Sequence, residues 1–164
     1  MREETHKKCI FAGTFDPPTI GHKALLEDCL KLFDEVVIGI LVNPQKQPYF
    51  SLNERKEMLA LLFPNEPKIK IVDFQGTVAE LLEKEQTSVY VRGVRNSTDL
   101  DYENANFYAS KKLNKDLTAV YLPCRQEYLH VSSSMVRNSL QFNTPIDEYV
   151  TEEVRTYILN KSKT

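Results

Sequence analysis

The stretch GTFDPPTIGH, residues 13–22, joins two segments that differ in the spacing of their apolar side chains. Residues 9–12, just before it, are all apolar, as in a buried strand. Residues 20–32 repeat apolar side chains at helical spacing. The prolines and glycines between these segments stiffen and turn the chain. The stretch therefore predicts a strand, a loop and a helix, which together form the first unit of an α/β fold.

The same alternation continues along the chain. Apolar runs rich in valine and isoleucine predict strands at Cys9–Ala12, Val36–Val42, Ile69–Phe74, Ser88–Val91 and Ala119–Leu122. Helical spacing predicts helices near Ile20–Leu32, Leu52–Leu62, Val78–Glu85, Leu100–Leu113, Ser134–Leu140 and Thr151–Asn160. Capping-box spacing at Ser51 and Thr77 marks two of the helix starts. We therefore expect an α/β fold, a single-domain, doubly wound, Rossmann-like five-stranded parallel sheet with additional C-terminal helices.

The composition is that of an ordinary globular domain. Apolar residues make up 41% of the 164 residues and charged residues 27%. No window approaches the roughly 18 continuous apolar residues that a membrane helix needs. The net charge of −2 argues against a broad nucleic-acid surface, because such binding depends on many phosphate contacts. We expect one domain over residues 1–164, with residues 1–7 as a short N-terminal extension, and neither nucleic acid nor a membrane as a partner.

The N-terminus and the cysteines favour a cytoplasmic location. Residues 1–8 are charged and lack the apolar stretch of a signal peptide. Cys9, Cys29 and Cys124 are odd in number and far apart in the sequence, so their spacing supports neither a disulfide framework nor a zinc site. We expect reduced thiols, with Cys9 and Cys29 buried.

The loop in residues 13–22 is a candidate phosphate site. We expect Gly13 to turn the backbone off the strand and Gly21 to allow close approach at the start of the helix. A helix N-terminus offers unpaired N–H groups and partial positive charge to an anion. Thr19 and His22 would share one face of the first helical turn. The alternative is a stiff connection with a threonine cap and a surface histidine.

Three further motifs follow predicted strands. VNPQKQP (residues 42–48) holds Lys46 between two prolines, and its alternative is a solvated surface lysine. VRGVRNSTDLDYE (residues 91–103) places Arg92 and Arg95 beside a turn at Gly93, and arginine is suited to bidentate phosphate recognition. Here the alternative is a pair of exposed arginines balanced by nearby aspartates.

The same segment ends in Glu103, which could accept hydrogen bonds from a ribose or an amino group. The last motif, VSSSMVR (residues 131–137), brings three serines to a helix start, where they either bind an anion or simply cap the helix. Parallel strands gather their carboxyl ends at one edge of the sheet, so the four motifs should converge there. The chain has no GxxxxGKS/T, GxGxxG or GxSxG motif.

Taken together, these four segments resemble the bacterial phosphopantetheine adenylyltransferases, which belong to the nucleotidyltransferases with an (H/T)xGH signature. GTFDPPTIGH, NPQKQPYFSLNERKEML, VRGVRNSTDLDYE and VSSSMVR stand in the family's order and near its spacings. The resemblance covers nearly all of the chain after residue 7. It implies transfer of an adenylyl group from ATP to 4′-phosphopantetheine, which gives dephospho-coenzyme A and pyrophosphate. It also implies Mg²⁺ bound mainly through the ATP phosphates, a homohexamer, and coenzyme A as a feedback inhibitor.

The resemblance also implies roles for individual residues. Thr14 and Lys46 would bind the phosphopantetheine phosphate and the α-phosphate region, Arg92 the pantetheine side, and Val78 would line the pantetheine site through its backbone. His22 would stabilise the transition state, with Lys46, Thr14 and Arg95 completing the catalytic group. The positions that match the ATP site are Thr14, Phe15, His22, Gly93, Val94, Arg95, Glu103, Tyr128, Leu129, His130, Val131, Ser132, Ser133 and Ser134.

Other readings remain open. Thr19 stands where many relatives outside the phosphopantetheine group have histidine, which favours this group over nicotinate mononucleotide adenylylation. A nucleotidyltransferase with another phosphorylated acceptor is the nearest rival. A non-catalytic nucleotide-binding regulator and an RNA-binding module are more distant ones. The regulator would bind ATP without forming pyrophosphate, and RNA affinity would fall steeply with salt.

Overall fold

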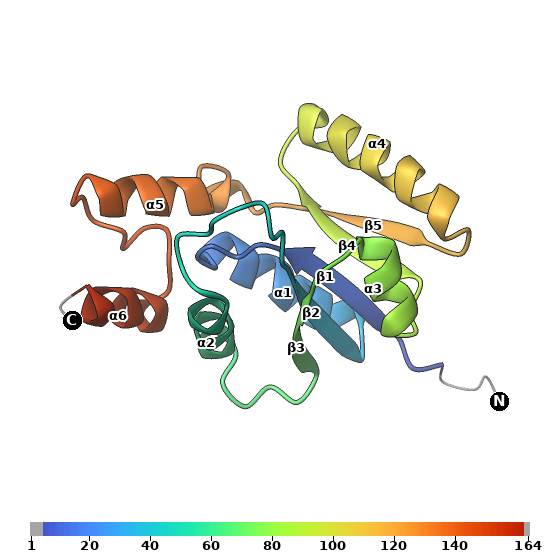
Figure 1. Ribbon diagram of the computed structural model, residues 1–164, viewed down its shortest axis with the longest axis horizontal. Coiled ribbons are helices and arrows are strands. Elements are labelled where there is room, and N and C mark those ends of the chain that lie inside the picture. The colour runs from blue at the N-terminus through green and yellow to red at the C-terminus, as the bar shows by residue number, and fades with distance from the viewer. Residues whose placement is uncertain (1–4, 163–164) are drawn as a thin grey trace.

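The computed structural model describes residues 5–162, which form five strands and six α-helices (Figure 1). The strands are β1 (Lys8–Gly13), β2 (Glu35–Leu41), β3 (Ile69–Phe74), β4 (Val89–Val94) and β5 (Thr118–Pro123). The helices are α1 (Ile20–Leu32), α2 (Leu52–Leu62), α3 (Val78–Lys84), α4 (Ser97–Leu113), α5 (Ser133–Gln141) and α6 (Glu152–Lys161), with a short 3₁₀ helix η1 (Gln126–Tyr128) before α5. Every predicted strand and helix is confirmed, most with ends that differ by one to three residues.

The five strands form one parallel sheet in the order β3-β2-β1-β4-β5. The chain builds outward from β1 to β3, crosses back through α3, and continues from β4 to β5. β1 and β4 are therefore neighbours at the point where the direction of winding reverses. Open sheets of this kind bind ligands beyond the carboxyl ends of the strands at that point. The predicted doubly wound, Rossmann-like sheet is confirmed.

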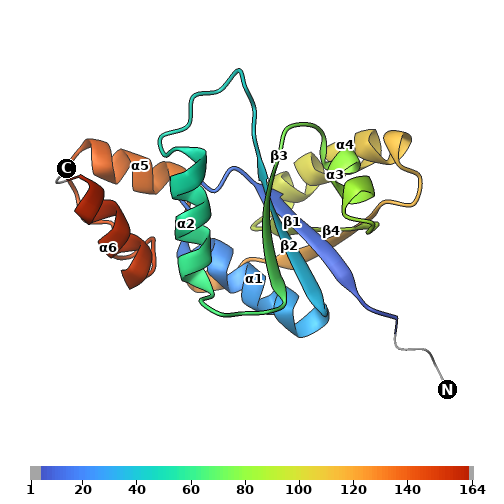
Figure 2. The same ribbon diagram turned by 60° about the horizontal axis from the view of Figure 1, so that its bottom comes forward.

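Two helical layers cover the sheet because side chains alternate between its faces along each strand. Cys9 and Phe11 of β1 face one cluster of buried residues, which also contains apolar side chains of α1, α2, α5 and α6. Ile10 and Ala12 face the second cluster, which α3 supplies with Leu81 and Leu82. Figure 2 shows α1 and α2 on one side of the strands and α3 and α4 on the other. The C-terminal helix α6 packs on α2.

Strand β4 ends at Val94, three residues later than the sequence indicates. Arg92 and Gly93 therefore lie within the strand, and the prediction of a flexible turn around Gly93 was wrong. A Cβ atom at Gly93 would come within 2.4 Å of Leu25 Cδ1, so the glycine allows α1 to pack closely on the sheet. Helix α4 begins at Ser97 instead of Leu100, with Asn96 as its N-cap.

The turn between β1 and α1 also differs from the expectation. Phe15 carries the left-handed backbone, with a φ of 50°, whereas Gly13 ends the strand. The side chain of Phe15 is only 2% exposed, and its ring packs edge-on against His22 at 5.0 Å between centroids. Burial of this aromatic ring offsets the modest cost that a non-glycine residue meets in this region. The packing of the phenylalanine, and not a glycine, holds the turn.

The cysteines and the N-terminal residues complete the fold. Cys9 and Cys29 are buried free thiols, as predicted, and belong to the same buried cluster despite their separation in the sequence. In the expected N-terminal extension, residues 1–4 lie outside the described part, and Lys7 N–H donates to Asp34 at 2.8 Å. No helix between residues 5 and 162 is long and apolar enough to cross a membrane.

Candidate active site

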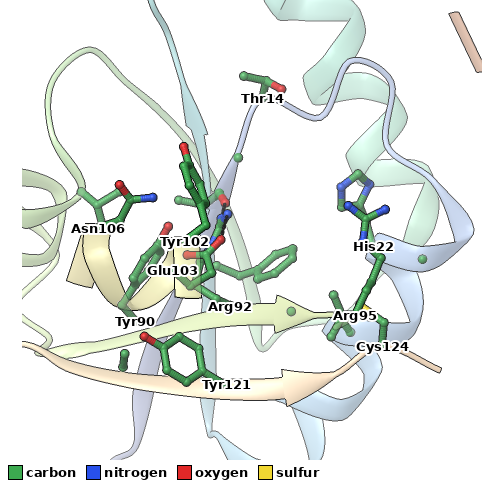
Figure 3. Close-up of a pocket in the computed structure, with 18 of the residues that line it drawn as sticks. Thr14, His22, Tyr90, Arg92, Arg95, Tyr102, Glu103, Asn106, Tyr121 and Cys124 are labelled. Atoms are coloured by element: carbon green, nitrogen blue, oxygen red, sulfur yellow. Dashed lines mark hydrogen bonds and ion pairs between the residues drawn. The ribbon is translucent and has the colours of Figure 1, made fainter. Parts of the chain in front are cut away.

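A cavity of about 660 Å³ lies at the carboxyl ends of β1 and β4. Its volume is in the range of small-molecule sites, roughly 300–1,000 Å³. Twelve predicted residues line it. They come from the loop after β1, from α1 and α3, from β4 and the turn after it, from α4 and η1, and from the start of α5 with the two residues before it. They are Thr14, Phe15, His22, Val78, Arg92, Gly93, Arg95, Glu103, Tyr128, Val131, Ser132 and Ser133. Figure 3 labels Thr14, His22, Arg92, Arg95 and Glu103 among them. Three of the four predicted motifs line this cavity, whereas the motif that holds Lys46 follows β2 at the same edge of the sheet without lining it.

His22 is held by a reciprocal capping arrangement at the start of α1. Its backbone N–H donates to Thr19 Oγ1 at 3.3 Å, and the Thr19 N–H donates to His22 Nδ1 at 2.9 Å. Because Nδ1 accepts this N–H, it carries no proton, and the neutral ring has its proton on Nε2. Nε2 lies on the opposite side of the ring, so the cap leaves a neutral N–H donor for the cavity that His22 lines.

Burial keeps this imidazole neutral. Burial, followed by the positive charges of Arg92 and Arg95, lowers the pKa of His22 to about 4. At neutral pH the ring is therefore a hydrogen-bond donor without charge. Histidine would be a poor general acid here, because so little of it is protonated at pH 7.

Arg92 is fixed inside the cavity by two acceptors. Its Nη1 donates to the carbonyl of Ala12 at 2.8 Å, and its Nη2 donates to Glu103 Oε1 at 2.7 Å. Glu103 is 8% exposed, so the acidic side of the ion pair is largely shielded from water. Arg92 Nε is buried and has no hydrogen-bond partner among the described residues. The sequence offered Glu103 as an acceptor for a ligand, and in the structure one of its oxygens holds an arginine.

Arg95 presents the more open cation. Its Nε donates to Asp99 at 3.2 Å, while the side chain remains 43% exposed. Within residues 5–162 no acceptor takes its Nη groups, and Figure 3 shows the side chain extending toward His22. Cys124 also lines the cavity, and burial raises the pKa of its thiol, so it stays protonated at neutral pH and is not a ready nucleophile.

The N-terminus of α5 closes the cavity beside the first loop. Ser132 is the N-cap and accepts the N–H of Met135 at 3.2 Å. Ser133 Oγ donates to the carbonyl of Pro17 at 2.8 Å and so ties α5 to the loop after β1. The first N–H groups of an α-helix have no partner inside the helix and suit an anion. The serine motif thus combines its two possible readings, because it caps the helix and borders the cavity.

Five predicted residues do not line the cavity. They are Lys46, Val94, Leu129, His130 and Ser134. Lys46 is exposed on the loop between β2 and α2, and His130 is exposed and packs against Tyr149 with 6.2 Å between ring centroids. Ser134 Oγ accepts from Arg137 at 3.1 Å. The roles of these five residues stay predictions.

Several aromatic and amide side chains that line the cavity were not predicted, among them Tyr90, Tyr121, Asn106 and Phe107. Tyr90 stands two residues before Arg92 and so on the same face of β4, and Tyr121 pairs with Arg92 in register on β5. Asn106 and Phe107 lie one turn beyond Glu103 on α4. Strand alternation and helical spacing around the predicted residues would have found these four. They give the arginine side of the cavity apolar and amide-binding surface.

The arrangement suits a phosphorylated ligand. It combines a neutral N–H donor, two guanidinium groups and two helix N-termini around one cavity. Between residues 5 and 162, no three histidine, cysteine, aspartate or glutamate side chains come together as metal ligands. The chemistry that follows is orientation of phosphates and neutralisation of their charge.

Comparison with known proteins gives a consistent result. A model of the cytidylyltransferase-like family matches residues 10–139. The chain is 36% identical, over 149 residues, to the phosphopantetheine adenylyltransferase of Flavobacterium johnsoniae, covering 91% of this chain and 97% of that protein.

Solved structures share the fold. The nicotinic acid mononucleotide adenylyltransferase of Plasmodium falciparum, complexed with NaAD, superposes with a TM-score of 0.72 at 18% identity, covering 96% of this chain and 97% of that one. A protein of Vibrio parahaemolyticus proposed to be a nicotinate-nucleotide adenylyltransferase gives a TM-score of 0.70 at 24% identity, covering 94% and 99%.

Proposed function

Because the chain belongs to the cytidylyltransferase-like family and, within it, to the phosphopantetheine adenylyltransferases, we propose that it transfers an adenylyl group from ATP to 4′-phosphopantetheine. The products are dephospho-coenzyme A and pyrophosphate, and the reaction is reversible. The observation that carries the proposal is the cavity in which a neutral His22, Arg92 and Arg95 surround the carboxyl ends of β1 and β4.

The reaction needs no side chain as a general acid or base. An oxygen of the phosphopantetheine phosphate attacks the α-phosphorus of ATP, a new P–O bond forms, and the bond between the α-phosphorus and the bridging oxygen to the β-phosphate breaks. The attacking phosphate is already ionised at neutral pH, so no side chain needs to remove a proton from it. The protein has to align the two phosphates and stabilise negative charge on the oxygens of the α-phosphate.

Each group at the cavity then has a part in this step. His22 Nε2–H donates to an oxygen of the α-phosphate, and Arg95 with the N-terminus of α5 binds the departing pyrophosphate. Arg92, held by Glu103, faces the pantetheine side together with Val78 and the apolar residues beyond it. Lys46 bridges the two phosphates when the loop that carries it lies over them. Thr14, which follows β1, binds the phosphopantetheine phosphate beside them.

Mg²⁺ is the proposed metal, and its ligands would be triphosphate oxygens and water. The residues that line the cavity fit this. Their carboxylate, Glu103 of α4, is already paired with Arg92, which leaves the metal to the phosphates and water. When bound, Mg²⁺ neutralises charge on the phosphates. We further propose a homohexamer and regulation by coenzyme A. Light scattering tests the hexamer directly. We also propose a cytoplasmic location, which the free thiols support.

Pyrophosphate release tests the function. The purified protein is given ATP and Mg²⁺ with 4′-phosphopantetheine, with nicotinate mononucleotide, or with no acceptor. We expect release that depends on phosphopantetheine. His22→Asn keeps an acceptor for the Thr19 N–H but removes the Nε2 donor, so its turnover should fall on the order of 10²–10³-fold with ATP affinity little changed. His6→Asn, at an exposed histidine that pairs with Glu35, is the matched control.

Two outcomes would contradict the proposal. Pyrophosphate release with nicotinate mononucleotide but not with phosphopantetheine would show that the acceptor is a different one. ATP binding without pyrophosphate release would indicate a regulator. An unchanged turnover number in His22→Asn would remove His22 from the mechanism.

A further inference from the structure

Arg55 is a buried cation without a carboxylate partner. It projects from α2, is only 4% exposed, and forms no ion pair with any residue between 5 and 162. Its Nε is buried and has no hydrogen-bond acceptor. Burial of an uncompensated charge is unfavourable, and arginine stays protonated in proteins. A role for this guanidinium must therefore be sought in its other contacts.

The hydrogen bond that Arg55 does form is made to the loop between β1 and α1, where the predicted phosphate site lies. Arg55 Nη1 donates to the carbonyl oxygen of Thr14 at 2.9 Å, across 41 residues of sequence. Thr14 and Phe15 line the cavity, whereas Arg55 does not. The arginine thus approaches the loop from the α2 side and holds the first carbonyl after β1 away from the cavity.

That contact fixes the orientation of one peptide group. The peptide that joins Thr14 to Phe15 is trans, so its C=O and N–H point to opposite sides. With the Thr14 carbonyl turned toward Arg55, the Phe15 N–H points toward the cavity. No acceptor in the described part of the chain takes this N–H. Phe15 also has a φ of 50°, a region that the backbone of this residue type seldom adopts unaided.

We propose that Arg55 is a positioning residue for the adenylyl transfer: it holds the Thr14–Phe15 peptide so that the Phe15 N–H donates to a phosphate oxygen. Arg55 itself touches no substrate. Its unpaired charge lies behind a phosphate-binding loop, where a bound anion compensates it. The proposal rests on the proposed function, because it requires a phosphate ligand in the cavity.

Arg55→Met is the first test. Methionine is apolar and of similar reach, and apolar replacement of buried charge is often neutral or stabilising. We therefore expect the midpoint of thermal unfolding to stay within about 5 °C of the native value. Turnover should nonetheless fall about 10²-fold, the typical loss for one well-placed oxyanion donor, with a change of less than a few fold in the KM for ATP.

Two further variants complete the comparison. Arg55→Lys keeps the charge and one donor, so it should recover turnover to within about tenfold of native. Lys56→Met removes a cation from the next position of α2, where the side chain pairs with Asp73 away from the loop, and should leave turnover unchanged. Equal turnover in Arg55→Met and the native protein would overturn the proposal. So would a loss of turnover matched by a loss of folded protein.

The amide of Phe15 gives a readout independent of activity. With 15N-phenylalanine labelling the chain shows eight such amides, and a Phe15→Leu variant identifies the relevant one. ATP should move this signal downfield in the native protein and much less in Arg55→Met. An unmoved Phe15 signal in the native protein at saturating ATP would refute the role. If the signal moves but pyrophosphate is never released, the proposed function fails and the role of Arg55 stands.

Discussion

The pKa of His22 makes stability depend on pH in a way that His22→Asn removes. Burial, with the charges of Arg92 and Arg95, lowers this pKa from 6.5 to about 4 in the folded protein. As the pH falls below 6.5, the unfolded chain binds a proton at His22 before the folded chain does. The contribution of the neutral histidine is therefore complete above about pH 6.5 and is lost as the pH falls toward 4.

The magnitude follows from the two pKa values. The full difference corresponds to about 3 kcal/mol in the free energy of unfolding, and about 2 kcal/mol is lost already at pH 5. These are upper values, because the ring borders a cavity that admits water. Asparagine does not titrate, and it still accepts the Thr19 N–H that caps α1. The pH-dependent term therefore separates cleanly from any constant effect of the substitution.

Urea unfolding at pH 8 and pH 5 measures the effect in both proteins. The stability of the native protein relative to His22→Asn should decrease by up to about 2 kcal/mol from pH 8 to pH 5. A relative stability that is the same at both pH values would show that folding does not lower the pKa of His22. A proton NMR titration of the imidazoles gives a second measure, in which the resonance absent from His22→Asn should titrate well below 6.5.

Three other substitutions test the surroundings of the cavity. Glu103→Gln removes the charge that holds Arg92, so steady-state kinetics should show the KM for phosphopantetheine rising about tenfold, roughly 1.4 kcal/mol, with a smaller change for ATP; an equal rise for both would contradict this. Gly93→Ala places a methyl group against Leu25 and should cost about 1–3 kcal/mol in urea unfolding, and an unchanged midpoint would be the contrary result. Asp16→Asn turns a carboxylate that accepts two loop N–H groups at 2.8 Å into an amide with one accepting oxygen, which should cost about 2 kcal/mol in the same measurement, whereas full stability would show that the loop does not need it.

The sequence predicts every strand and helix because their apolar spacing is regular. It misplaces the end of β4, since two arginines and a glycine look like a turn when read locally. Gly93 is instead required by the packing of Leu25 from α1, which is a contact between distant segments. In the same way, the left-handed residue is Phe15 and not Gly13, because burial of the phenylalanine ring decides the conformation of the loop.

The sequence predicts which residues line the candidate site better than it predicts which of them pair with one another. Motifs that follow parallel strands reach one edge of the sheet, so most of the predicted residues line one cavity. The pairing of Arg92 with Glu103 depends on how α4 lies over β4, which residue spacing alone does not reveal. Arg55 escapes sequence reasoning for a similar reason. Its contact with Thr14 spans 41 residues, and a helical arginine ordinarily reaches solvent.

The function proposed for this cavity is the transfer of an adenylyl group to phosphopantetheine. A competition experiment tests it most directly: ATP and Mg²⁺ with equal, saturating concentrations of 4′-phosphopantetheine and nicotinate mononucleotide, and products identified by mass. We expect dephospho-coenzyme A and pyrophosphate in equal amounts, with no nicotinate adenine dinucleotide. Formation of the nicotinate adenine dinucleotide as the main product, or pyrophosphate without dephospho-coenzyme A, would contradict it.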